Sequence, residues 1–386
     1  MSEESEASHE PLVSTRLDSL DVYRGFVMFW IIGGGALAQA LAGLTEVDSV
    51  VIETLSLQLE HVKWEGFRFY DLIFPSFVFI VGTSLVYSLG RFSGTGNRKS
   101  ATFRVIRRGL MLWLIGIIYY GGISKGLYDE ASHQGVRLLG VLQRIGICYL
   151  VTGLLFLYVP LRGLIAVFLG ILAGYWALLT FVPVPGQEAI SYEEGKNLTN
   201  WFDSKYLPFF KWRVTHDPEG ILSTFPAIAT CLLGVFAGVL VKSSRPSRWA
   251  TCGLLLVAGA CLIGLGHLWG MTFPVIKNIW TSSFVLMAGG WSLVLLGVLY
   301  GIIDLLGWKK WTMPFVWVGM NPIAIYLLTS VVSFNEIASR ILGGPVAEWA
   351  DGLTPGLGKL LIAIAGLTMV LWLCRTFYRN NLFFRV

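Results

Sequence analysis

Residues 60–82 read EHVKWEGFRFYDLIFPSFVFIVG, and this stretch decides how the chain is built. Its first half is polar and contains His61, Trp64 and Asp71, whereas its second half is apolar enough to begin a membrane span. Ionisable side chains at the edge of a bilayer are costly unless they are paired or functional. We therefore expect a site at the end of a membrane-spanning helix, although His and Trp are also ordinary anchors at membrane interfaces.

The composition places the rest of the chain in the same class. Of the 386 residues, 55% are hydrophobic and only 14% are charged, whereas soluble proteins carry about 25% charged residues. The mean hydropathy is +0.66. We predict an all-α polytopic membrane protein, a bundle of about ten transmembrane helices embedded in the lipid bilayer. The net charge of +5 then sets orientation and does not indicate a nucleic-acid partner.

Apolar segments long enough to cross a bilayer follow one another along the whole chain. We expect spans at about 20–44, 70–90, 109–123, 138–158, a segment ending near 182, 221–241, 249–266, 281–306, 313–332 and 356–374. They form a single membrane domain, 20–376, between an N-terminal tail, 1–19, and a C-terminal tail, 377–386. The outer loops are 45–68 and 183–220.

The short loops rich in Lys and Arg all fall on one side of this arrangement. They contain Arg91, Arg98, Lys99, Arg104, Arg107, Arg108, Lys242, Arg245, Arg248, Lys309 and Lys310. Because basic loops stay on the cytoplasmic side, we predict that both termini are cytoplasmic. The N-terminal stretch also lacks the basic and apolar regions of a cleaved signal.

His61 is the first candidate for chemistry. A neutral imidazole can attack a thioester carbonyl and carry the acyl group, or it can deprotonate an incoming nucleophile. Asp71 can orient the ring and stabilise its cation. Asp71 can equally well cap the helix that begins beside it, since Asp is favoured at helix starts.

Two arginines lie at the edge of an apolar span or inside one. Arg24 sits at a cytoplasmic end, where its guanidinium can meet the phosphates of a cytosolic donor or extend to lipid headgroups. Arg144 is deeper and requires a partner, for which the outer carboxylates are the nearest in depth. Asn321 precedes a proline that breaks a span, either as a kink or beside a cavity. With Gln143, these residues are the predicted donor contacts.

The polar residues predicted on the outer side are candidates for binding a second substrate. They are Trp64, Asp217, Glu219, His267, Lys277 and Asn278. Asp217-Pro218-Glu219 is also an ordinary helix start, so that part of the pattern has a purely structural explanation. No GxxxxGK[ST], CxxC or HExxH pattern occurs, so neither a P-loop nor a metal site is expected.

Six stretches along the chain together resemble one family. They are RLDSLDVYRG (16–25), HVKWEGFRFYDLIFPSFVFIVG (61–82), GVLQRIG (140–146), DPEGIL (217–222), KNIWTSSFVL (277–286) and GMNPIAIY (319–326). This set resembles the heparan-α-glucosaminide N-acetyltransferase family of transmembrane acyltransferases, including its uncharacterised bacterial members. The family's active-site histidine lies in an H-x-x-W-x-G pattern ahead of D-L-x-F-P, which His61, Trp64, Gly66 and Asp71 match.

The resemblance implies a membrane enzyme that takes acetyl from cytosolic acetyl-CoA and delivers it across the membrane to an amino sugar or glycan. It implies a bacterial inner-membrane location and a possible homodimer. The sequence also departs from the family, because the position of an active-site asparagine is occupied by Ile31 and the large luminal N-terminal domain of the lysosomal member has no counterpart. The alternative is a transporter of amino sugars or sugar fragments, in which the same polar groups bind substrate without acyl transfer.

Overall fold

The computed structural model describes residues 17–44, 50–90, 92, 98–122, 124, 126–129, 132–243 and 246–383. Most of the predicted N-terminal tail, residues 384–386 of the C-terminal tail, and Arg91 and Arg245 of the basic loops lie outside these ranges. The chain is built from helices, with one short antiparallel strand pair, β1 (Tyr128–Asp129) and β2 (Gln134–Gly135). The all-α architecture predicted from the sequence is confirmed.

Eight helices are long and apolar enough to cross a membrane. They are α1 (Asp18–Ala42), α3 (Phe69–Leu89), α5 (Val141–Tyr158), α6 (Leu161–Phe181), α8 (Thr224–Lys242), α9 (Arg248–Gly270), α10 (Ser282–Leu299, continued by π-helical turns at Tyr300–Leu305) and α15 (Leu357–Arg379). This number applies to the part of the chain that the structure describes. A bent pair of shorter helices raises it to nine.

The bent pair corresponds to the span expected at 313–332. It consists of a 3-10 turn (Lys310–Thr312), α11 (Met313–Gly319) and α12 (Pro322–Val331). The span bends by 68° between α11 and α12. The break falls at Asn321-Pro322 because proline has no backbone N–H for the preceding turn and is well placed to start a new helix. The kink inferred from the sequence is therefore confirmed.

The remaining segment expected to span the membrane, 109–123, lies in α4 (Arg98–Tyr119). This helix starts eleven residues before the predicted segment, inside the basic stretch. Arg104, Arg107 and Arg108 lie in its first half and make it too polar to count as a span by composition. This helix accounts for the difference between the expected number of about ten and the nine found.

The buried centre of the bundle is formed by α3 and α8, which pack along each other. Their backbones approach so closely that a Cβ on Gly82 would lie 1.9 Å from the carbonyl oxygen of Cys231. A Cβ on Gly234 would lie at the same distance from the carbonyl oxygen of Phe79. Small residues at such crossings let membrane helices associate through close van der Waals packing. The pairs α4–α5, α9–α10 and α1–α11 complete the bundle around α3 and α8.

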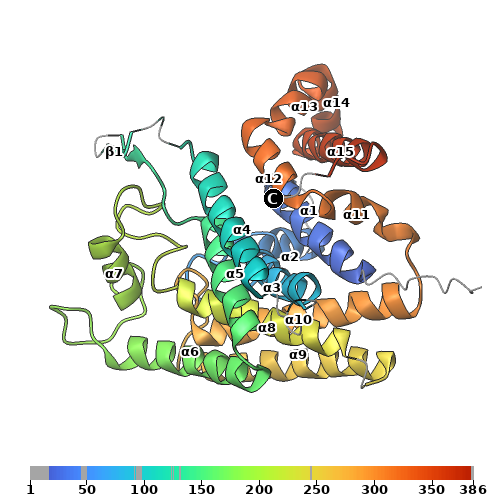
Figure 1. Cartoon of the computed structure of the whole chain (residues 1–386). Coiled ribbons are helices and arrows are strands. Elements are labelled where there is room, and N and C mark those ends of the chain that lie inside the picture. The colour runs from blue at the N-terminus through green and yellow to red at the C-terminus, as the bar shows by residue number, and fades with distance from the viewer. Residues whose placement is uncertain are drawn as a thin grey trace, which may run out of the picture.

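Shorter helices cover the ends of the bundle. α2 (Val50–Gln58) and α7 (Leu198–Tyr206) lie in the two predicted outer loops, where no helix was expected from the sequence. Figure 1 shows α7 and β1 together at one end of the bundle. Two further helices, α13 (Phe334–Leu342) and α14 (Pro345–Leu353), pack against α15. The loops therefore form a folded layer that contains Trp64, Asp217 and Glu219, whereas Arg24, Arg144 and His267 lie on α1, α5 and α9.

Candidate active site

His61 and Asp71 meet at the start of α3. His61 Nδ1 lies 2.8 Å from Asp71 Oδ1. The Asp71 side chain is only 1% exposed, whereas that of His61 is 53% exposed. Because an ionised carboxylate can only accept, Nδ1 carries the proton and Nε2 keeps its lone pair. Asp71 thus holds the ring through Nδ1. The side chain of His61 remains accessible, and Nε2 is the nitrogen that can act as a base or nucleophile.

The second oxygen of Asp71 holds the local backbone. Oδ2 accepts hydrogen bonds from the backbone N–H groups of Val62 and Arg68, each at 3.2 Å. The bond from Arg68 caps the first turn of α3, and the bond from Val62 fixes the loop that carries His61. One carboxylate therefore both caps the helix and contacts the imidazole, and its part in catalysis stays a prediction.

Lys277 completes this cluster from a distant part of the chain. Its Nζ lies 3.3 Å from Asp71 Oδ1, and 2.9 and 3.4 Å from Nδ1 and Nε2 of His61. Burial lowers the pKa of Lys277, which the nearby Asp71 carboxylate partly offsets. The sequence had placed Lys277 only at the outer face, and the packing of α10 against α3 brings it to His61.

The aromatic ring of Tyr70 lies against the imidazole. The ring of Tyr70 lies 4.7 Å from that of His61 between centroids, and its hydroxyl lies 3.5 Å from the backbone oxygen of Trp30 on α1. Trp64 donates from Nε1 to the backbone oxygen of Tyr192 at 2.8 Å. The loop that carries His61 is thereby joined to the long outer loop.

A second ionic cluster consists of Arg137, Asp217 and Glu219. Arg137 binds Asp217 through two hydrogen bonds, Nε to Oδ2 at 2.9 Å and Nη2 to Oδ1 at 2.6 Å, and also donates to Glu219 Oε2 at 2.6 Å. Its guanidinium lies between the rings of Tyr120 and Trp212, at 4.4 and 5.1 Å. Burial alone lowers the pKa of Arg137, but Asp217 and Glu219 outweigh it and the pKa is raised. Arg137 therefore stays charged in this largely buried position.

Arg144 is fully buried beside this cluster. It donates to the hydroxyl of Ser223 and, at 3.3 Å, to the backbone oxygen of Gly220. Its guanidinium lies 5.0 Å from the centroid of the Trp280 ring. The partners expected from the sequence, the outer carboxylates, are bound directly by Arg137 instead, a residue for which the sequence had suggested no role.

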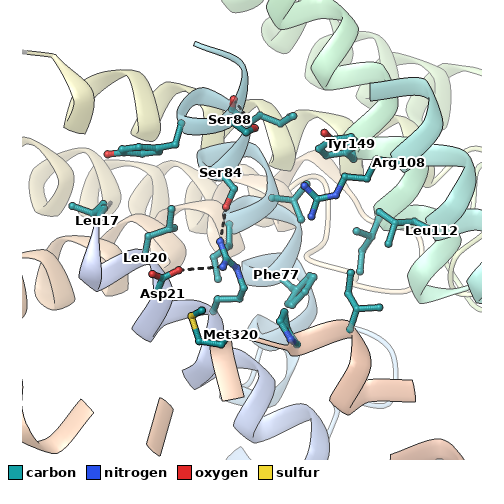
Figure 2. Close-up of a pocket in the computed structure, with 18 residues that line it drawn as sticks. Leu17, Leu20, Asp21, Phe77, Ser84, Ser88, Arg108, Leu112, Tyr149 and Met320 are labelled. Carbon is teal, nitrogen blue, oxygen red and sulfur yellow. Dashed lines mark hydrogen bonds and ion pairs between the residues drawn. The ribbon is translucent and has the colours of Figure 1, made fainter. Parts of the chain in front are cut away.

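A cavity of about 590 Å³ opens at the opposite end of α1 and α3. Arg24 lines it and donates to Asp21 Oδ1 at 3.2 Å and to Ser84 Oγ at 2.9 Å, so the side chain points between helices. Figure 2 shows Asp21, Ser84 and Arg108 around this space. The Arg108 guanidinium lies 5.0 Å from the centroid of the Tyr149 ring. The cavity thus presents two arginines beside apolar walls.

A second, apolar space of only about 20 Å³ lies next to this cavity. Four residues line both spaces, namely Phe77, Ile145, Pro322 and Ile323. Ile31, Phe74 and Tyr326 line the smaller space. Phe74 packs edge-to-face on Trp280 at 5.4 Å, three residues from Lys277. The broken span therefore borders a cavity, as one of the two sequence interpretations of Asn321-Pro322 proposed.

Four other predicted site residues make no hydrogen bond with His61 or Asp71 in the described structure. Gln143 is buried and donates to the backbone oxygen of Arg137 at 3.0 Å, and Asn321 donates to the backbone oxygen of Leu382 at 2.8 Å. Neither residue lines the cavity beside Arg24, so their contacts with a donor stay predictions. His267 is exposed on α9, and Asn278 follows Lys277 on its turn. Within the described ranges, no three His, Cys, Asp or Glu residues could hold a metal ion.

Comparison with known proteins gives the family. Residues 16–269 match the model of the catalytic domain of heparan-alpha-glucosaminide N-acetyltransferase. The chain belongs to this family. It is 28% identical to heparan-alpha-glucosaminide N-acetyltransferase of Homo sapiens over 371 residues, covering 81% of this chain and 52% of that protein. The Mus musculus protein of the same name is 28% identical over 324 residues, covering 69% and 48%.

The chain spans about half the length of the curated relatives it matches. The resemblance to this family inferred from the sequence is confirmed. The family match includes His61, Asp71 and Arg137 and ends before Lys277. Sequence reasoning missed Arg137 and Tyr70 as neighbours of these centres. A basic residue in a loop and an aromatic beside an acid are too common to single out without the packing.

Proposed function

We propose that this protein transfers an acetyl group from cytosolic acetyl-CoA to the amino group of an amino sugar or glycan on the outer side of the membrane. The observation that carries the proposal is the arrangement along α3. Its first turn bears Asp71 beside His61, and Ser84 near its other end lines the arginine-containing cavity. The helix rises roughly 20 Å between Asp71 and Ser84. One helix therefore connects a candidate donor site to a candidate reaction centre.

The donor end fits a phosphorylated, elongated molecule. Arg24 and Arg108 offer guanidinium groups suited to phosphates, and Ser84 and Asp21 hold Arg24 in place. The remaining walls are mostly apolar, and the second, smaller space next to the cavity lies between α1, α3, α5 and α12. In this arrangement the phosphates of acetyl-CoA remain near the arginines while the long pantetheine arm carries the thioester toward His61.

At His61 the reaction is a direct acyl transfer. The acceptor amine attacks the thioester carbonyl carbon, and His61 Nε2 takes the proton that the amine loses. Asp71 stabilises the resulting imidazolium through Nδ1–H. The carbon–sulfur bond then breaks, and the CoA thiolate leaves and takes up a proton. An acyl-imidazole formed first at Nε2 is the other route that this geometry allows.

The acceptor end offers an exposed carboxylate, Glu194, to an amino sugar. Glu194 lies on the long outer loop that Trp64 joins to the loop carrying His61, whereas Asp217 and Glu219 are already paired with Arg137. Burial raises the pKa of Glu219, and Arg137 opposes this shift. We assign this side to the space outside a bacterial inner membrane, with both termini in the cytoplasm. The homodimer remains a prediction from the family resemblance.

Incubation of the purified full chain with acetyl-labelled acetyl-CoA tests the proposal. Label in N-acetylglucosamine after addition of glucosamine supports it, and label on protein without an acceptor indicates the acyl-imidazole route. Vesicles containing the protein provide the comparison with the transporter alternative. Uptake of unmodified glucosamine without any transfer of label would favour the transporter and refute the acetyltransferase.

A further inference from the structure

Lys277 lies beside the ring edge of His61 on which the reaction would occur. Nζ is 2.9 Å from Nδ1 and 3.4 Å from Nε2 of His61. Because Nδ1 already donates its proton to Asp71, it has no lone pair to accept from an ammonium group. The short contact with Nδ1 is therefore not a hydrogen bond to His61. Lys277 Nζ instead donates to Asp71 Oδ1 at 3.3 Å, and its positive charge lies 3.4 Å from Nε2, the nitrogen that keeps its lone pair.

The turn that carries Lys277 is held from both sides. Trp280 N donates to Lys277 O at 3.0 Å, and Ile276 N donates to Thr281 Oγ1 at 3.1 Å. Gly66 N donates to Val275 O at 2.9 Å, so this turn is tied directly to the loop of His61. A lysine side chain is long and flexible. Here the backbone that carries Lys277 is hydrogen-bonded to the loop that carries His61, and this fixes where the side chain begins.

The same turn contains strained backbone. Trp280 has a φ of 52°, a conformation that bulky residues rarely adopt. Its side chain is 1% exposed and donates to Thr230 Oγ1 at 3.1 Å, and Phe284 packs against it. Such strain persists only where the surrounding packing over-determines it, and it is typical of functional sites. The buried indole anchors the turn so that Lys277 is aimed at His61.

From this geometry we propose that Lys277 is a catalytic residue whose ammonium group stabilises the negative oxygen of the tetrahedral intermediate. This rests on the proposed acetyl transfer. When the amine attacks, the carbonyl π electrons move to the oxygen, and they return when the carbon–sulfur bond breaks. Lys277 Nζ lies 3.4 Å from His61 Nε2. When the thioester carbonyl is close to Nε2, its oxygen can therefore also be close to the Lys277 ammonium group. The proton taken by His61 is distinct from those of Lys277, which remain on Nζ throughout.

The charged groups that face Lys277 fix its dependence on pH. They are Asp71 from α3, His61 from the adjoining loop and Glu219 ahead of α8. Burial lowers the pKa of Lys277, and the two carboxylates oppose this. Because only the ammonium form stabilises an oxyanion, the reaction slows as the pH rises through that lowered pKa. Arginine at this position keeps its proton and moves the loss to higher pH.

The test compares Lys277→Met, Lys277→Arg and Lys63→Met with the wild-type chain in nanodiscs. Lys63 is exposed on the His61 loop, so its replacement removes one outer charge and serves as the matched control. We expect Lys277→Met to lower kcat for acetyl transfer to glucosamine by about 10²–10³-fold. Its Kd for acetyl-CoA should remain within about twofold of wild type, since a bound thioester carries no charge on its oxygen. Lys277→Arg should retain part of the activity and extend it to higher pH.

Three results would overturn the inference. The first is a kcat of Lys277→Met close to that of Lys63→Met, and the second is a raised KM for glucosamine with unchanged kcat, which indicates substrate binding only. The third result applies even if Lys277→Met does not fold. It is a pH profile of Lys277→Arg in which activity is lost at the same high pH as in the wild-type chain. The proposed function fails separately, through absence of transfer by the wild-type chain or full activity of His61→Ala.

Discussion

His61 Nδ1 lies 2.8 Å from Asp71 Oδ1, and the side chains differ sharply in exposure, 53% for the imidazole and 1% for the carboxylate. A buried acceptor beneath an accessible ring leaves one nitrogen free and fixes the other. In the proposed reaction, the accessible imidazole of His61 would contact the substrate and the buried carboxylate of Asp71 would orient it.

The first prediction concerns His61. Replacement by Ala should abolish acetyl transfer, because no other imidazole in the described chain contacts Asp71. Binding of acetyl-CoA and the Tm should change little, since the side chain is half exposed and contributes little to packing. His133→Ala is the control, because His133 lies between β1 and β2 and contacts Tyr128 and the backbone oxygen of Lys211 in the loop 183–220. Comparable losses in both variants would contradict a special role of His61.

Asp71→Asn should separate orientation from packing. The amide still offers one oxygen acceptor, but it cannot hold Nδ1–H and the Val62 and Arg68 backbone as a carboxylate does. It also lacks the charge that stabilises an imidazolium. We expect kcat to fall by up to about 10⁴-fold, as carboxylate-to-amide exchange does in a catalytic triad. Turnover and acetyl-CoA affinity measured on the same sample check this, and a change confined to affinity would count against it.

Arg24→Ala should raise the KM for acetyl-CoA with a smaller effect on the KM for the acceptor. A charge-assisted hydrogen bond to a phosphate is worth about 1.5–3 kcal/mol, so a rise of about tenfold or more is expected. Arg107→Ala is a suitable control, since Arg107 is exposed on α4 one residue before Arg108 and does not line the cavity. An unchanged donor KM in Arg24→Ala would remove this residue from the donor site.

Asp203 makes the stability depend on pH. Burial raises its pKa from 3.8 to about 7, with Asp217 adding to the shift and the Ile221 N–H and Arg144 opposing it. Because the folded-state pKa lies above the unfolded one, the stabilisation present below about pH 4 is lost as the pH rises to about 7. Asp203→Asn has no carboxyl group to ionise at this position, so it should not lose this stability. At pH 8 its free energy of unfolding should exceed that of wild type by at most about 4 kcal/mol.

Thermal unfolding of both proteins from pH 4 to pH 8 measures this difference. Asp203 Oδ1 accepts from Ile221 N at 2.8 Å, and the amide oxygen introduced by Asp203→Asn can still accept from the same group. Glu193→Gln provides the comparison, because Glu193 is exposed on the same loop and should leave the pH dependence unchanged. Parallel pH curves for wild type and Asp203→Asn would show that Asp203 is ionised in the folded state at no cost.

The orientation can be tested by labelling single cysteines. Cys261 is the exposed one among the five cysteines, so its replacement by Ser gives a suitable background. Lys99→Cys at the start of α4 should react only from the cytoplasmic side, and Ser204→Cys on α7 only from outside. An impermeant maleimide applied to intact cells distinguishes them. Labelling of Lys99→Cys from outside would reverse the predicted topology.

The sequence alone determined the membrane class and most of the spans. Long apolar runs can only be satisfied by helices in a bilayer, so composition and length suffice to predict them. The break at Asn321-Pro322 was equally accessible, because proline interrupts a helix, and His61 and Asp71 were candidates by residue type before the structure showed their contact. The ordered motifs also identified the family correctly. In each case the deciding interactions are close in the chain or depend on residue type alone.

The tertiary structure decided which distant groups meet. Lys277 lies 216 residues from His61, and Arg137 lies 80 residues from Asp217, yet both pairs are in direct contact. Arg24 and Arg108 share one cavity only because α1, α3 and α4 pack as they do. Hydropathy predicts that a helix spans the membrane, but it does not predict how the helix is rotated about its own axis. That rotation depends on close contacts such as Gly82 on Cys231, which no single segment of sequence contains.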